Sequence, residues 1–462
     1  MIPLSLAEVA EAAGGRLDGV ADAQTTVDGP VVADSRAVPP GGLFVAVPGE
    51  RVDGHDFAAA AVGSGAVAVI AQRPVGVPAV VVEDSVAALG RLARAVLDRL
   101  GGVSVVAVTG SSGKTTTKDL LAQVLASRGP VVAPPGSYNT EVGVPLTVLS
   151  ADRSTRTLVV EMGARGPGHI AYLCGIAPPT VGVVLNVGSA HLGEFGDREA
   201  IARSKAELVE ALPDRGTAVL NGDDPLVRRM ADKTRAGVLM VGESVHADVR
   251  AEDVAVDDRG RARFTMVTPG GTAAVRLGLV GEHQVANALA AAGAAHALGL
   301  DAATVADALT HAKALSRWRM EVTERADGVT VVNDAYNANP ESMRAALQAL
   351  GAMASGRRTW AVLGEMRELG ETSAAEHDAL GGLAVRLGVD RLVAVGEPAR
   401  AIQLGAARDG SGEDQTAWVP DVDAALDLLR RQVQPGDVVL VKASRAVGLE
   451  RLAEAMLQEV SR

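Results

Sequence analysis

A glycine-rich loop between a predicted strand and a predicted helix constrains the fold of this chain more than any other feature. An apolar stretch at residues 103–108 runs into Thr-Gly-Ser-Ser-Gly-Lys-Thr-Thr-Thr at residues 109–117, and a helical pattern follows. Strand, glycine turn and helix in this order let backbone N–H groups converge on phosphate oxygens, at which the positive end of the helix dipole also points. The sequence therefore predicts a nucleotide-binding domain of the α/β class.

The side chains of this loop match the tasks of a triphosphate site. Its candidate ATP-binding residues are Gly110, Ser111, Ser112, Gly113, Lys114, Thr115 and Thr116. The Lys114 ammonium can reach the terminal phosphates, and the hydroxyl of Thr115 or Thr116 is left to hold magnesium. Val108 stands where the general motif has its first glycine, so the loop is a compact variant. An ordinary Gly/Ser turn before a helix is the alternative, and it explains the glycines but not a lysine followed by three threonines.

The composition of the chain narrows the kinds of ligand and location to consider. Its 462 residues have a formal net charge of −12, which argues against a nucleic-acid surface because a phosphate backbone needs concentrated Lys and Arg. The single Cys174 excludes an internal disulfide, and the start Met-Ile-Pro-Leu-Ser lacks the basic and apolar regions of an export signal. No uninterrupted apolar stretch reaches membrane-spanning length. We therefore expect a cytoplasmic protein that binds small, metal-neutralised ligands and neither nucleic acid nor membrane.

The order of the predicted elements indicates three α/β domains. A small domain at residues 1–101 ends at a Gly-Gly pair, just before the nucleotide strand. The central domain, residues 102–314, contains the phosphate loop and further apolar strands. Strands and helices alternate through residues 315–462, which predicts a doubly wound, Rossmann-like sheet with a ligand crevice at its carboxyl edge.

Three side chains beyond the phosphate loop are candidates for a metal site. Glu161 ends an apolar strand at residues 157–160, where its carboxylate would offer magnesium an oxygen ligand; capping of the next helix is the alternative. His191 and Lys205 follow the next buried strand, and each alone would be a structural histidine or a solvated lysine. Three such groups around one crevice predict a metal site beside the triphosphate.

Two further polar clusters are candidates for ligand binding. Asp34, Ser35 and Arg36 lie between β-like runs of the first domain, where an ordinary surface turn is the alternative. In the third domain, a strand at residues 329–332 ends in Asn-Asp-Ala-Tyr-Asn-Ala-Asn-Pro, and the last strand delivers Lys442. Both segments of the third domain would lie at the carboxyl edge of its sheet.

Taken in order, these motifs resemble the Mur ligases of bacterial peptidoglycan synthesis, and the resemblance runs the whole length of the chain. It rests on the phosphate loop, Glu161-Met-Gly, residues 186–191, Lys205, Asn287 and residues 334–340. Within the family, residues 334–343 resemble the type that adds D-alanyl-D-alanine, whereas the Asp-Asn-Pro-Arg signature of the diaminopimelate-adding type is absent from the sequence. The cluster at Asp34 is similar to the uridine-nucleotide-binding domain that these two types share.

The resemblance implies a reaction in which ATP, UDP-N-acetylmuramoyl-tripeptide and D-alanyl-D-alanine give UDP-N-acetylmuramoyl-pentapeptide, ADP and phosphate. The γ-phosphate first moves to the terminal carboxylate of the peptide, and the dipeptide amine attacks the resulting acyl phosphate. Lys114 and magnesium would spread the charge on the transferred group. The family pattern implies two Mg²⁺ ions, one held by Thr115 and Glu161 and the other by His191 and a carbamate of Lys205 formed with carbon dioxide.

The resemblance also assigns binding residues in all three domains. Asn287 would meet the adenine, and Asp334 and Arg319 would reach from the third domain to the ribose and γ-phosphate, with Arg317 as the alternative to Arg319. Ala443 stands where the family has glycine between lysine and serine. The residues expected to bind the substrates are Asp34, Ser35, Arg36, Asn139, Thr140, Tyr336, Asn337 and Lys442.

Three other functions are compatible with the sequence. A sister ligase that adds lysine or diaminopimelate is the nearest. A relative of folylpolyglutamate synthase would leave the first domain unexplained. A nucleotide-gated binding protein without ligation chemistry would give Glu161, His191 and Lys205 no reason to converge. For the ligase that the resemblance implies, we expect a monomer.

Overall fold

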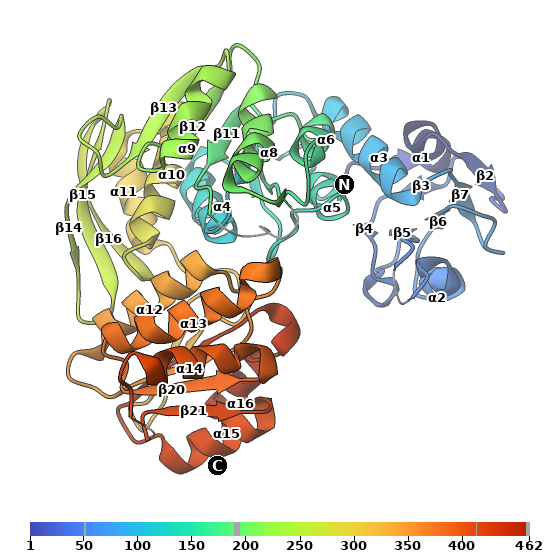
Figure 1. The fold of residues 1–462 in the computed structure, drawn as a ribbon. Coiled ribbons are helices and arrows are strands. Elements are labelled where there is room, and N and C mark those ends of the chain that lie inside the picture. Colours follow the sequence, from blue (N-terminus) through green and yellow to red (C-terminus); the bar gives the residue numbers. More distant parts are fainter. Residues whose placement is uncertain (50–51, 189–194, 413, 459–462) are drawn as a thin grey trace.

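The chain folds around three main β-sheets, one for each of three α/β units that follow one another along the sequence (Figure 1). The computed structural model describes residues 1–49, 52–188, 195–412 and 414–458. This arrangement confirms the predicted α/β class and three-domain organisation. Within the described ranges, no helix combines the length and apolarity needed to cross a bilayer.

The first unit contains a five-stranded sheet in the order β2-β7-β6-β5-β4, with a short β1–β3 ribbon beside it. The strands are β1 (Leu4–Ser5), β2 (Arg16–Asp18), β3 (Thr26–Val27), β4 (Val31–Val32), β5 (Leu43–Val45), β6 (Ala68–Ala71) and β7 (Ala79–Val81). The helices are α1 (Leu6–Ala13), α2 (Ala58–Gly63) and α3 (Ser85–Leu100), with short 3₁₀ turns η1 (Ser35–Ala37) and η2 (Gly54–Phe57). Every residue of β5 and β6 is buried, as parallel strands covered on both faces require.

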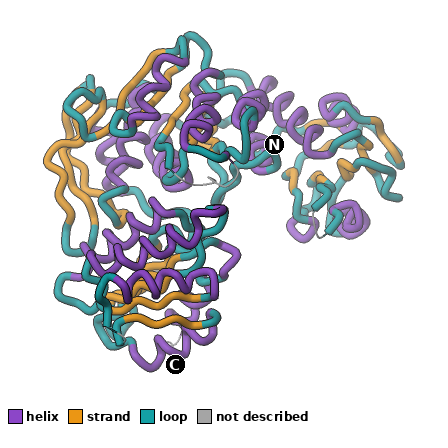
Figure 2. The backbone as a smooth tube through the Cα atoms, viewed as in Figure 1, coloured by secondary structure: helices purple, strands orange, loops and turns teal. Residues whose placement is uncertain are grey.

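The central unit has a nine-stranded sheet in the order β16-β15-β14-β13-β12-β11-β8-β10-β9. The strands are β8 (Ser104–Thr109), β9 (Val131–Val132), β10 (Thr157–Glu161), β11 (Val181–Val184), β12 (Thr217–Asn221), β13 (Gly237–Gly242), β14 (Val249–Val256), β15 (Arg261–Thr268) and β16 (Gly271–Val280). The helices are α4 (Lys114–Val124), α5 (Gly143–Leu149), α6 (His169–Ile176), α8 (Arg198–Glu210), α9 (Pro225–Arg228), α10 (Gln284–Ala297) and α11 (Ala302–His311). The long strands β14 to β16 form an antiparallel extension at one side (Figure 2).

The strand before the phosphate loop shows why this segment forms the centre of the sheet. Val106 and Val108 of β8 belong to a core with α4 and α10, whereas Val105 and Ala107 belong to a core on the opposite face. Successive side chains of a strand point to opposite faces, so an unbroken apolar run suits a strand covered on both sides. β8 pairs in parallel with β10 and β11, which places their carboxyl ends at one edge.

The third unit has a six-stranded sheet in the order β17-β18-β22-β19-β20-β21, with only β17 antiparallel among the described strands. The strands are β17 (Glu321–Glu324), β18 (Thr330–Asn333), β19 (Thr359–Leu363), β20 (Arg391–Val395), β21 (Thr416–Val419) and β22 (Val438–Lys442). The helices are α12 (Pro340–Ala354), α13 (Ser373–Arg386), α14 (Arg400–Arg408), α15 (Val422–Gln432) and α16 (Glu450–Gln458). α12 to α14 cover one face and α15 and α16 the other, so the predicted doubly wound sheet is confirmed.

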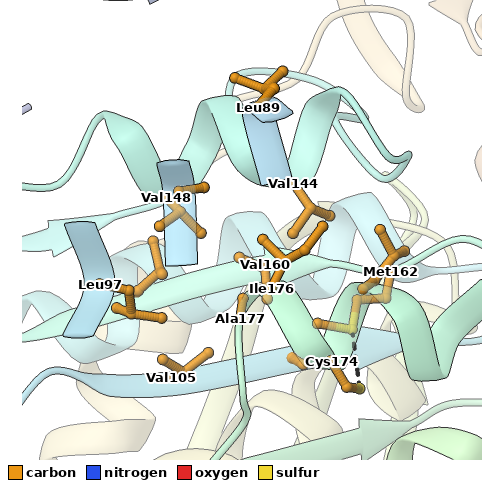
Figure 3. Close-up of a cluster of buried hydrophobic side chains, with 14 of the residues drawn as sticks. Leu89, Leu97, Val105, Val144, Val148, Val160, Met162, Cys174, Ile176 and Ala177 are labelled. Carbon is orange, nitrogen blue, oxygen red and sulfur yellow. Dashed lines mark hydrogen bonds between the residues drawn. The ribbon is translucent and has the colours of Figure 1, made fainter. Parts of the chain in front are cut away.

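The first and central units share one hydrophobic core. Leu89 and Leu97 of α3 pack with Val144 and Val148 of α5 and with Ile176 at the end of α6 (Figure 3). All five side chains are buried. The apolar face of α3 therefore anchors the first unit on the central one.

Candidate functional site

The phosphate loop lies at the carboxyl end of β8 and is held in shape by Asn186, which follows the neighbouring strand β11. Asn186 Oδ1 accepts hydrogen bonds from the backbone N–H groups of Ser111 and Ser112, at 3.0 and 2.9 Å. Ser111 Oγ in turn accepts from the Gly188 N–H at 2.9 Å. Gly113 has φ +81°, and a side chain there would collide with Asn287. The glycine is therefore required both by the backbone conformation and by the close approach of α10.

Lys114 is the first residue of α4, and its side chain folds back over the loop. Its ammonium donates to the Gly110 carbonyl at 2.7 Å. Burial lowers the pKa of Lys114, the nearby Glu161 carboxylate raises it, and the Arg319 guanidinium lowers it. The ammonium thus lies among the groups that the sequence assigned to ATP and magnesium.

Glu161 is fully buried at the end of β10 and accepts three hydrogen bonds. Thr115 Oγ1 donates to its Oε2 at 2.9 Å, while Ser137 Oγ and Asn139 Nδ2 donate to its Oε1 at 2.8 and 2.7 Å. The next helix, α6, begins at His169 with Gly168 at its N-cap position, so the helix-capping alternative for Glu161 is wrong. A buried carboxylate beside two hydroxyls is an oxygen donor set that suits a hard cation such as magnesium.

Lys205 projects from α8 and is almost completely buried. Burial, and secondarily the positive charge of Lys114, lowers the pKa of Lys205 to about 7. Its charged and neutral forms are therefore close in energy near neutral pH. His191, its predicted partner, lies outside the described residues.

Arg319 crosses from the third unit to the phosphate loop. Its Nη2 donates to Thr115 Oγ1 at 3.2 Å, and its guanidinium stacks 4.1 Å from the ring centre of Tyr336. Arg317 instead pairs with Glu454 on α16 at 2.7 Å and is well exposed. Of the two arginines, Arg319 is therefore the one that contacts the phosphate loop, and its contact with ATP stays a prediction.

The backbone around Arg319 is strained. Trp318 and Met320, on either side of it, have φ of 59° and 48°, a region that side chains other than glycine rarely adopt. Each such residue costs roughly 1–3 kcal/mol and persists only where its surroundings fix it. Here the Met320 N–H donates to Asp334 at 3.0 Å, and the Trp318 N–H donates to Glu321 at 3.0 Å. Asp334 therefore helps to aim Arg319.

Lys442 and Asp334, both predicted to face the crevice, form a buried ion pair. Their Nζ and Oδ2 atoms are 2.6 Å apart, and Nζ also donates to the Asn337 carbonyl at 2.9 Å. Burial lowers the pKa of Lys442, and Asp334 opposes this shift. His283, to which the sequence gave no role, lies near this pair; burial lowers its pKa to about 4, so the ring is neutral at pH 7. Its position just before α10 was the only sequence signal.

Three further candidates, Asn287, Thr140 and Thr116, lie in the central unit. Asn287 accepts from Thr117 Oγ1 at 3.3 Å and donates to Gln284 at 2.8 Å. Thr140 Oγ1 accepts from the Gly143 N–H at the start of α5. Thr116 lines a small cavity between α4 and Arg319. The adenine and substrate roles of Asn287 and Thr140 stay predictions.

The Asp34 cluster lies on the surface of the first unit. Arg36 donates to both carboxylate oxygens of Asp34, at 2.9 and 2.7 Å, and both side chains are largely exposed. The hydrogen bonds from the Arg36 guanidinium, and secondarily the one from its backbone N–H, lower the pKa of Asp34 to about 2. Ser35 begins the 3₁₀ turn η1 that Asp34 caps. This geometry is also that of a well-capped surface turn, so the UDP role of the cluster stays a prediction.

Sequence reasoning missed a set of contacts on the side of α4. Lys118 is buried, pairs with Asp119 at 2.6 Å and donates to the Pro134 carbonyl at 2.6 Å. Asp119 and Gln123 contact the backbone of residues 313–316. The four-residue spacing of Thr115, Asp119 and Gln123, which places them on one face of α4, was the available signal.

Family models of the Mur ligases match most of the chain. The Mur ligase family, catalytic domain model matches residues 30–96, the Mur ligase middle domain model residues 108–295, and the Mur ligase, glutamate ligase domain model residues 318–445. Each match falls on one of the three units described above.

Individual relatives match over almost the full length. The chain is 52% identical to UDP-N-acetylmuramoyl-tripeptide--D-alanyl-D-alanine ligase of Mycobacterium tuberculosis, covering 99% of this chain and 98% of that protein. The crystal structure of MurF from Acinetobacter baumannii aligns with a TM-score of 0.88 at 33% identity, over 99% of both chains. MurF ligase from Thermotoga maritima in complex with ADP aligns with a TM-score of 0.80 at 36% identity, over 94% of this chain and 98% of that one. This chain therefore belongs to the Mur ligase family.

Proposed function

We propose that this chain is an ATP-dependent ligase that joins D-alanyl-D-alanine to UDP-N-acetylmuramoyl-tripeptide and gives the pentapeptide precursor, ADP and phosphate. The main support for the proposal is that the Thr115 hydroxyl contacts side chains from two units. It donates to Glu161 of the central unit and accepts from Arg319 of the third unit. Mycobacterial relatives that bear this ligase name match the chain at 50% identity or more over almost its whole length.

The phosphoryl step uses positive charge from both units. The terminal carboxylate of the peptide attacks the γ-phosphorus of ATP, the bond to the ADP oxygen breaks, and an acyl phosphate forms. Lys114 and Arg319 stabilise the negative charge on the transferred group and orient it. The amine of D-alanyl-D-alanine then attacks the acyl carbon, phosphate leaves with the bonding electron pair, and the nitrogen loses a proton.

Thr115 and Glu161 would hold one magnesium ion, and His191 with a carbamate of Lys205 would hold a second. Bound magnesium supplies charge neutralisation at the phosphates. Lys205 can provide an oxygen ligand only after modification: its neutral amine adds carbon dioxide, an N–C bond forms, and one proton is released. The lowered pKa of the buried Lys205 supports this step, because a substantial fraction of the amine is neutral near pH 7.

The binding roles extend over all three domains. Residues 1–101 would bind the UDP part through Asp34, Ser35 and Arg36, residues 102–314 would bind ATP, and residues 315–462 would complete the active site. Asn287 would contact the adenine and Asp334 the ribose. The substrate-binding residues near the reacting groups would be Asn139, Thr140, Tyr336, Asn337 and Lys442. The enzyme would act as a cytoplasmic monomer.

Coupled phosphate release tests the proposal directly. Purified protein is given MgATP and UDP-N-acetylmuramoyl-tripeptide, with and without D-alanyl-D-alanine. The expected result is phosphate release that requires the dipeptide, with a product heavier by one D-alanyl-D-alanine residue pair in mass spectrometry. Release with lysine or diaminopimelate and the UDP-dipeptide instead would identify a sister ligase, and bound ATP without acceptor-dependent release would identify a binding protein.

A further inference from the structure

Two side chains of α4 hold the segment that joins the central unit to the third unit. Gln123 Nε2 donates to the Lys313 carbonyl at 2.9 Å, and Gln123 Oε1 accepts from the Lys313 N–H at 2.9 Å. One turn closer to the phosphate loop, Asp119 Oδ2 accepts from the Ser316 N–H at 3.0 Å. Both contacts use backbone groups of the segment, so they fix its path whatever side chains it bears.

These contacts continue into the active site. Thr115, Asp119 and Gln123 are spaced four residues apart and therefore lie on one face of α4. Thr115, the third member of this row, accepts from Arg319 Nη2. Gln123 thus pairs with residue 313, Asp119 with residue 316 and Thr115 with residue 319. Four residues along α4, about 6 Å, therefore correspond to three residues of the segment, which runs antiparallel to the helix. The segment is thus laid along α4 in a defined register that ends at the phosphate loop.

The row is buried where it approaches the site. Asp119 is 6% exposed and Ser316 7% exposed, and the cavity between the helix and the segment is small. On its far side Arg319 is fixed by the hydrogen bond from Met320 to Asp334. Arg319 is therefore held between two anchors, one on α4 and one in the third unit.

We infer that Gln123 and Asp119 are positioning residues for phosphoryl transfer, which set the register of residues 313–319 on α4 and so deliver Arg319 to the phosphate loop. The inference rests on the proposed ligase function. Because the loop itself would hold ATP, an error in register should lower kcat more than it lowers the affinity for ATP. Asp119 also neutralises the buried Lys118, so Gln123 is the cleaner position to test.

The test replaces Gln123 by methionine, which keeps the length of the side chain and its helix propensity. The substitution removes both hydrogen bonds to Lys313 and a third, within α4, to the Asp119 carbonyl at 3.0 Å. Gln348→Ala, an exposed glutamine of α12, serves as the control. We expect kcat of Gln123→Met to fall about tenfold, the Kd of ATP to change less than about twofold, and Gln348→Ala to match the wild type. Amide exchange across residues 313–319 should become faster in Gln123→Met.

A double-mutant cycle separates positioning from a general loss of structure. If Gln123 acts through Arg319, Gln123→Met has a much smaller effect on kcat when Arg319→Lys is already present. An unchanged kcat, or an equal fall in both backgrounds, overturns the inference. A wild-type protein without acceptor-dependent phosphate release overturns the proposed function instead, and in that case unchanged exchange at residues 313–319 in Gln123→Met still rejects the role of Gln123.

Discussion

Glu161→Gln is the substitution that best separates a ligand-holding carboxylate from a structural one. Glutamine has the same shape, and its oxygen can still accept from Ser137 and Asn139. Its amide nitrogen would face Thr115, whose hydroxyl can turn toward Ser137, 3.4 Å away. The fold therefore loses the charge at position 161 but few hydrogen bonds.

The expected magnitudes differ sharply for stability and activity. Weaker neutral hydrogen bonds cost about 1–2 kcal/mol, and part of this cost is offset because a neutral amide is less costly to desolvate on folding than a carboxylate. The free energy of unfolding of Glu161→Gln should therefore differ from that of the wild type by less than about 2 kcal/mol. Under the proposed function, the substitution removes a negatively charged ligand of the magnesium ion that Glu161 would hold, so kcat/KM should fall about 10³-fold or more, equivalent to about 4 kcal/mol.

Asp437→Asn is the matched control. Asp437 is also a buried carboxylate, but it lies just before β22, at the amino edge of the third sheet, where Arg358 and Trp360 donate to it. This substitution should lower the free energy of unfolding and leave kcat/KM nearly unchanged. Urea unfolding and phosphate release at increasing magnesium measure both quantities. Near-normal turnover by Glu161→Gln, or a loss of stability larger than that of Asp437→Asn, would refute the assignment.

Three further predictions concern Lys205 and the first unit. Lys205→Ala should lose activity, and acetate should restore part of it by supplying carboxylate oxygens; full activity without acetate would contradict the carbamate. In metal-free, carbon-dioxide-depleted buffer, the pKa of Lys205 is about 7 in the folded protein and higher in the unfolded chain. Above pH 7 the unfolded chain therefore binds more protons than the folded protein. Wild-type stability should therefore rise from pH 7 toward pH 10 by up to about 1.4 kcal/mol per pH unit relative to Lys205→Met, as urea unfolding would detect. Arg36→Ala should raise KM for the UDP substrate more than it lowers kcat, and a fall in kcat alone would place the UDP site elsewhere.

Sequence reasoning succeeded where the determinants of structure are local. The apolar run before the phosphate loop and the glycine at position 113 fix strand, turn and helix start within about ten residues. Glu161 was placed correctly at the carboxyl edge because a buried parallel strand has only one such end.

The contacts between units could not be predicted in the same way. The sequence favoured Arg319 and left Arg317 as the alternative; in the structure Trp318 and Met320 have a left-handed backbone, Arg319 contacts the loop and Arg317 contacts α16. Lys442 was expected at the crevice, but its pairing with a side chain 108 residues away depends on the order of strands. Such long-range pairings leave no periodic pattern in the chain.

Because α3 shares a hydrophobic core with the central unit, the units that unfold cooperatively differ from the three α/β units of the fold. Leu89 and Leu97 precede the Gly-Gly break at residues 101–102, yet their packing partners Val144 and Val148 lie beyond it. Units joined by a continuous apolar core lose their tertiary structure together, so the first two units should act as one cooperative block during thermal denaturation. A graft of the first unit onto a related ligase would keep its solubility only if the matching face of α5 were transferred as well.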